Sequence, residues 1–207
     1  MKNITILFII FNTQYGFGQE YFFDTFYQYV DKKFGRSAVH LQNSKDNNYG
    51  FNTGINAVNK FGHIYDCKKN ISHEHEINNV NGGVEFTYLY SSDFKPDTKT
   101  YINTHVFDHQ IKTIDSLNTE VTIAAYRNIK KRRIDRKIKV IIQKSSVDNT
   151  EYFINYYTHG TFINSDFSFP PGTPTQIEVD YCNGNHYIYD LVTKKSIQTK
   201  LVIKNIE

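Results

Sequence analysis

Recognisable catalytic motifs are missing from this 207-residue sequence. It contains no Gly-x-Ser-x-Gly turn, no His-Glu-x-x-His helix and no glycine-rich phosphate-binding loop. No apolar run approaches the roughly 20 residues that a membrane-spanning helix requires. We therefore expect a soluble chain with no transmembrane segment and no bound cofactor.

Cysteine is scarce as well, with only Cys67 and Cys182 in the chain. In an exported protein these two residues could form a single disulfide, which would stabilise the fold by about 4 to 5 kcal/mol in the chain-entropy model. Two free, buried thiols are the alternative, because a domain of this size can bury enough apolar surface to fold without a bridge.

The N-terminal segment has the pattern of a secretory signal. Lys2 supplies a basic start, residues 4–11 are apolar, and Gly16 and Gly18 are small residues before Gln19. This pattern predicts a signal peptide over residues 1–18 and an exported protein, in the periplasm or outside the cell. No cysteine stands near the expected cut to carry a lipid anchor.

The remainder of the chain predicts an all-β fold. Short alternating runs bounded by Asn, Gly, Asp and Lys recur throughout, which is typical of antiparallel sheets. We expect a single antiparallel domain over residues 19–207 with about ten to twelve strands, as a curved or half-open barrel rather than a two-sheet sandwich. One expected strand is 151–157, and another lies within 21–30 and places Tyr21, Phe23, Tyr27 and Tyr29 on one face.

Asn183 and Gly184 give the strongest turn signal in the sequence. They stand between two alternating runs and predict a hairpin with a two-residue type I′ turn. In that register Tyr181 lies opposite His186 and Val179 lies opposite Ile188. The apolar face would then carry Ile177, Val179, Tyr181 and Ile188, and the half-wet face would carry Glu178, Asp180, Cys182, Tyr187 and Tyr189.

Two histidines alternate with two glutamates at residues 73–76. On a strand, His73 and His75 point to one face about 7 Å apart, which suits two ligands of a metal ion that needs a third ligand from elsewhere. The alternative interpretation, which we favour, is a solvated strand face with no metal.

A strongly basic segment occupies residues 127–144, with nine lysines and arginines and one acid, Asp135. Its pattern predicts a β-hairpin. The predicted ligand-binding residues are the tip and its flank: Lys130, Lys131, Arg132, Arg133, Arg136, Lys137 and Lys139. Such a cluster could contact a polyanion, for example an acidic glycolipid. Lysines that keep a sheet edge from pairing with other chains are the alternative.

Together these features favour an exported, non-enzymatic binding or envelope-associated protein. Its aromatic faces could hold an apolar or glycan ligand, and the basic hairpin could contact polyanions. The competing hypothesis is a metal-dependent enzyme centred on His73 and His75.

Overall fold

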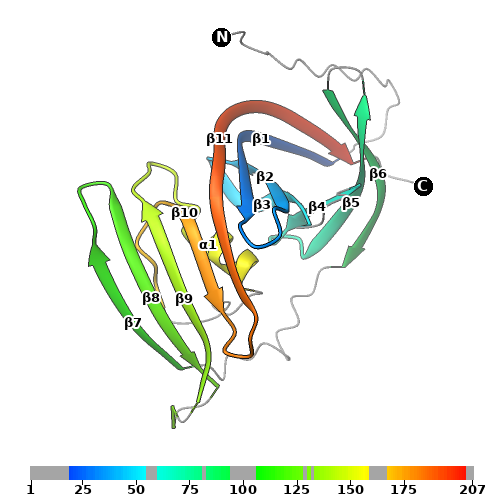
Figure 1. Cartoon of the computed structure of the whole chain (residues 1–207). Coiled ribbons are helices and arrows are strands. Elements are labelled where there is room, and N and C mark those ends of the chain that lie inside the picture. The colour runs from blue at the N-terminus through cyan, green and yellow to red at the C-terminus, as the bar shows by residue number, and fades with distance from the viewer. Residues whose placement is uncertain are drawn as a thin grey trace. The chain divides into compact units, whose positions relative to one another are not determined.

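The structure is a computed structural model. It describes residues 19–54, 60–80, 83–93, 106–127, 130–131, 133–158 and 167–203. The expected signal peptide, residues 1–18, lies outside the described residues. Figure 1 shows the strands and the single described helix along the chain.

The described strands form one antiparallel sheet. They are β1 (Gln19–Asp31), β2 (Ser37–Asn43), β3 (Asp46–Thr53), β4 (Phe61–Asp66), β5 (Ile71–Val80), β6 (Gly83–Asp93), β7 (Val106–Thr113), β8 (Asn118–Tyr126), β9 (Ile134–Gln143), β10 (Thr173–Asp180) and β11 (His186–Ile203). Their order in the sheet is β6-β5-β4-β3-β2-β1-β11-β10-β9-β8-β7. The edges are β6 and β7, so the sheet is open. The predicted all-β fold with ten to twelve strands is confirmed.

The contacts within the chain divide it into two compact units. The first contains residues 1–27, 38–94 and 194–207, and the second contains residues 28–37 and 95–193. Strands β1 and β11 contribute to both units. The predicted aromatic face of β1 is confirmed, since Tyr21, Phe23, Tyr27 and Tyr29 are each at most 2% exposed. The prediction that residues 19–207 form a single domain stays a prediction.

The first unit has its own apolar core. Alternation along its strands directs one side chain in two inward, which is how a half-buried sheet acquires a core. The buried cluster consists of Tyr21, Phe23, Leu41, Phe51, Ile64, Leu201 and Ile203. Partly buried side chains from β5 and β6, including Ile77, Phe86 and Tyr88, pack against it.

The second unit contains the described helix, α1 (Thr150–Tyr157), which packs against β10. The prediction of a strand over residues 151–157 is therefore wrong. Phe153, Ile154 and Tyr157 are all buried, and their i, i+1, i+4 spacing puts them on one helical face. This tertiary burial outweighs the β-propensity of the aromatic residues, which was the basis of the strand prediction.

The predicted register of the β10–β11 hairpin is also wrong, by one residue. Tyr181 donates its backbone N–H to the carbonyl of Asn185 at 3.0 Å, and Val179 lies opposite Tyr187. A three-residue loop with Cys182 at φ 53° and Gly184 at φ 93° replaces the two-residue turn. Because a one-residue slip exchanges the faces of a strand, Tyr189 joins Ile177 in the core instead of the polar face.

Candidate functional site

His73 and His75 are buried in the first unit. Their exposed fractions are 3% and 2%, so the predicted solvated face for these two histidines is wrong. The strand alternates as expected, but its histidine side faces the core and its glutamate side, with Glu74 and Glu76, is partly exposed. The sequence pattern alone could not distinguish the two sides, because histidine and glutamate are both polar.

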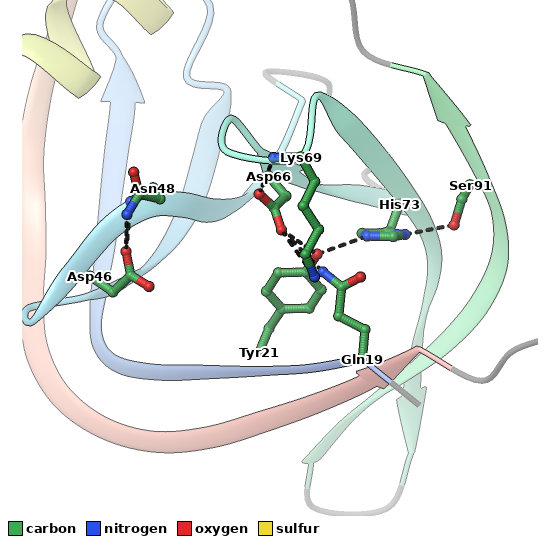
Figure 2. Close-up of polar contacts among 8 residues, drawn as sticks. All are labelled: Gln19, Tyr21, Asp46, Asn48, Asp66, Lys69, His73 and Ser91. Atoms are coloured by element: carbon green, nitrogen blue, oxygen red, sulfur yellow. Dashed lines mark hydrogen bonds and ion pairs between the residues drawn. The ribbon is translucent and has the colours of Figure 1, made fainter. Parts of the chain in front are cut away.

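Four side chains form a continuous hydrogen-bonded series that we call the polar chain: Ser91, His73, Tyr21 and Asp66 (Figure 2). Ser91 Oγ lies 2.6 Å from His73 Nδ1, and His73 Nε2 lies 2.9 Å from the Tyr21 hydroxyl. Tyr21 donates its hydroxyl proton to Asp66 Oδ2 at 2.9 Å. The polar chain thus joins β6, β5, β1 and β4 and leads from an exposed serine to a buried carboxylate.

Asp66 ends the polar chain and is held by further donors. Gln19 Nε2 donates to Oδ2 at 3.0 Å, and the backbone N–H of Lys69 donates to Oδ1 at 2.9 Å. The Lys69 ammonium lies 3.8 Å from Oδ2. Both oxygens of this buried carboxylate therefore have hydrogen-bond donors, as a buried polar group requires.

Burial keeps the phenol and the imidazoles of this region uncharged. Desolvation and the hydrogen bond to Asp66 raise the pKa of Tyr21, so its hydroxyl remains protonated. Desolvation lowers the pKa of His73, and it lowers the pKa of His75 to about 4. His75 packs edge-on against Phe51 and Tyr88, and its buried Nδ1 has no hydrogen-bond partner among the described residues.

The metal hypothesis rests on the same two histidines. Both ring nitrogens of His73 are engaged in hydrogen bonds, to Tyr21 and Ser91. Within the described part of the chain, no group of three histidine, cysteine, aspartate or glutamate side chains is placed to hold a metal ion. The metal hypothesis therefore stays a prediction, with no third ligand for His73 and His75 among the described residues.

The basic segment forms the predicted hairpin, with β8 paired to β9. Its cations pair with acidic side chains of β7 and β8 that lie outside residues 127–144. Lys131 pairs with Asp108 of β7, and Lys139 lies 2.9 Å from Glu120 of β8. Lys130 and Arg133 are exposed, and Arg132 lies outside the described residues. Cross-strand acids therefore neutralise part of the charge that the segment carries on its own.

Arg136 is held by several partners at once. Its guanidinium forms an ion pair with Asp135 at 3.0 Å and donates to the Thr158 carbonyl at 3.1 Å. It also lies over the ring of Tyr181 at 5.1 Å. These contacts make Arg136 a structural cation of the second unit.

Lys137 and Lys139 instead line an open depression of about 640 Å³ on the polar side of β7–β10, which we call the sheet groove. Strand register aligns two polar rows across it. One row contains Asp108, Ala124, Lys137, Asp180 and His186, and the other contains Gln110, Thr122, Lys139 and Glu178. The lining therefore alternates cations, carboxylates and small residues.

Cys67 and Cys182 are free and exposed in the structure. They belong to different units. The structure thus has the two free thiols that the sequence left as the alternative to a disulfide, though as exposed groups.

The chain was compared with known proteins. No protein-family model matches it, and no curated protein matches it. No helix among the described residues is long and apolar enough to cross a membrane.

Sequence reasoning missed Tyr21, Asp66 and Ser91 as members of a site. The alternation of residues 21–30 places Tyr21 only on an aromatic face, and no local pattern distinguishes Ser91 from the other serines of the sequence. No local motif links the three residues, because they come from strands β1, β4 and β6, which are not neighbours in the sheet order and are connected through side-chain hydrogen bonds.

Proposed function

We propose that the protein is an exported binding protein that holds a glycan segment in the sheet groove. The observation that carries this proposal is the mixed lining of the groove, in which Lys137 lies between Ala124 and Asp180 in one cross-strand row. A sugar hydroxyl both donates and accepts hydrogen bonds. It is therefore suited to a surface on which ammonium donors and carboxylate acceptors alternate.

The shape and hydration of the sheet groove also favour such a ligand. Thr122 and Ala124 are small, so they leave room over the middle of the sheet. The walls come from longer side chains of β9 and β10, including Lys139 and Glu178. An open surface lined by charged, polar and small side chains suits a ligand that keeps part of its hydration and is held by several directed hydrogen bonds.

A polyanion is less well suited to the same surface. The groove lining includes two lysines but three carboxylates, those of Asp108, Glu178 and Asp180. A phosphate- or sulfate-rich ligand would meet these carboxylates at close range, and like charges at close range repel. We therefore place the glycan ahead of the acidic glycolipid as the partner.

The test is a binding measurement with short neutral oligosaccharides, for instance cello- and chito-oligomers, and a heparin fragment as the polyanion. We expect a neutral oligosaccharide to bind and Lys137→Ala to weaken it at least about tenfold, because a charge-assisted hydrogen bond contributes roughly 1.5 to 3 kcal/mol. Lys112→Ala is the matched control, since Lys112 is an exposed lysine of β7 outside the groove lining.

Two outcomes would overturn the proposal. One is the absence of binding to any neutral oligosaccharide in the set. The other is tight, salt-sensitive binding of heparin alone, lost when Lys130 and Arg133 are both changed to serine, which would instead support the polyanion partner.

Export is the second part of the proposal, and it is supported by the signal pattern of residues 1–18. We expect protein recovered from its own cells to begin at Gln19, because Gly16 and Gly18 leave room for the cut. N-terminal sequencing or intact mass measures this. Recovery of Met1 on protein from the cell envelope would contradict it.

A further inference from the structure

The proton positions along the polar chain follow from its hydrogen bonds. Tyr21 has one hydroxyl proton and donates it to Asp66, so the Tyr21 oxygen can only accept from His73. His73 must then carry its proton on Nε2, 2.9 Å away. Nδ1 is left unprotonated, as an acceptor, and it faces Ser91 Oγ at 2.6 Å. The series therefore fixes the tautomer in which His73 can take a proton from Ser91.

A β-bulge brings a second hydroxyl, that of Tyr88, into contact with Ser91. The register of β5 and β6 shifts between Glu74 and His75, so that Glu74 lies opposite Tyr90 and His75 opposite Tyr88. Residues 88 and 91 would face opposite sides of a regular strand, but the extra residue lets both approach the histidine side. Tyr88 Oη lies 2.8 Å from Ser91 Oγ. Since Ser91 donates to His73, Tyr88 is the donor in this contact.

In the polar chain the histidine is buried and the serine is exposed, as a reactive serine requires. His73 is 3% exposed and contacts Tyr21 of β1, whereas Ser91 is exposed on the edge strand β6. The neutral imidazole that desolvation favours is the form that accepts a proton. The hydroxyl that would lose the proton is open to an incoming molecule.

We propose that Ser91 is a nucleophilic serine that accepts acyl groups from activated esters, with His73 as its general base and Tyr21 and Asp66 as positioning residues. In this step Ser91 Oγ forms a bond to the ester carbonyl carbon while its proton moves to His73 Nδ1. The carbonyl carbon then releases the alkoxide, which takes that proton and leaves as an alcohol. The products are acyl-Ser91 and the free alcohol, and His73 returns to its starting state.

This activity goes beyond ligand binding and lies wholly in the first unit, whereas the sheet groove lies in the second. It needs no metal and no redox partner. The arrangement contains the three parts of a catalytic triad, which are a nucleophile, a base and a group that orients the base. In this protein a phenol lies between the histidine and the carboxylate.

The experiment uses the full exported chain with a fluorophosphonate probe, followed by intact mass and peptide mapping. We expect one covalent adduct, on Ser91, because general-base assistance accelerates such reactions about 100-fold or more. Ser92 provides the internal comparison, since it is also exposed on β6 but lies opposite Ser72 rather than His73. Ser91→Ala should abolish the adduct, and Ser92→Ala should leave it unchanged.

The positioning role is tested separately with Tyr21→Phe, which keeps the ring but removes the hydroxyl. We expect slower labelling by at least about tenfold and loss of the fixed tautomer, observed in the imidazole ¹⁵N shifts of His73. The native protein should show the Nε2-protonated form.

The proposal is overturned if the native protein is not labelled above a heat-denatured sample, or if Ser92 reacts as fast as Ser91. An Nδ1-protonated His73 in the native protein would overturn it as well. Because these readouts use the unmodified chain, poor folding of a variant cannot obscure them.

Discussion

Replacing Gly62 with alanine is expected to destabilise the first unit by about 3 kcal/mol, at the upper end of overpacking effects. A Cβ at this position would lie 2.2 Å from Cζ and 2.7 Å from Cε2 of Phe51. Phe51 is fully buried and packs edge-on against Phe86 at 5.2 Å between ring centroids. Moving its ring would therefore disturb packed side chains of the core. Urea unfolding measures the loss.

A second variant shows whether the cause is the contact with Phe51. Leucine at position 51 is shorter, so Gly62→Ala should cost much less in the Phe51→Leu background than in the native one. The coupling between the two changes should reach about 1 kcal/mol or more, as for residues in direct contact. Equal costs in both backgrounds would mean that some other feature of β4 requires glycine.

Acidification is expected to produce the second large effect, through buried histidines of the first unit. Burial lowers the pKa of His75 to about 4 and that of His40 to about 3, from an ordinary value near 6.5. Unfolded protein then binds more protons than folded protein, so stability is fully present above pH 6.5. It is lost as pH falls toward these lowered pKa values. Each histidine should account for about 2 kcal/mol between pH 7 and pH 5.

Urea unfolding at pH 7, 6 and 5 measures this dependence. His75→Gln should remove about half of the loss attributed to the two histidines, because glutamine does not titrate. The comparison uses the change in stability with pH, so any fixed cost of the substitution cancels. A stability that stays constant from pH 7 to pH 5 would show that these histidines are not kept neutral by burial.

Much of the fold could be predicted from alternation alone. The buried face of β1 follows from the spacing of Tyr21, Phe23, Tyr27 and Tyr29, and the β8–β9 hairpin follows from the apolar residues that flank the basic tip. These features are local, so a single segment contains the information that determines them.

The errors arose where a distant contact decides the local structure. Residues 150–157 form a helix because they pack on β10. The β10–β11 register depends on which tyrosine side chain of β11 is buried in the core, and that residue is Tyr189. The burial of His73 depends on Tyr21, 52 residues away. No pattern within residues 70–79 carries that information.

The charge of the candidate sites also depends on distant residues that the local sequence does not reveal. The basic segment has one acid of its own, but the sheet brings Asp108 and Glu120 to Lys131 and Lys139. The net charge of the segment therefore overstates how much of its positive charge is unpaired. Only the strand register identifies Lys137 and Lys139 as part of a mixed-charge groove.

Amide chemical shifts of the ¹⁵N-labelled chain, titrated with a neutral oligosaccharide to saturation, test the binding proposal most directly. The proposal predicts changes concentrated at Ala124, Lys137 and Asp180 and their neighbours on β7–β10, with little change in β4–β6. Changes confined to β4–β6, or no changes at saturating concentrations, would contradict it.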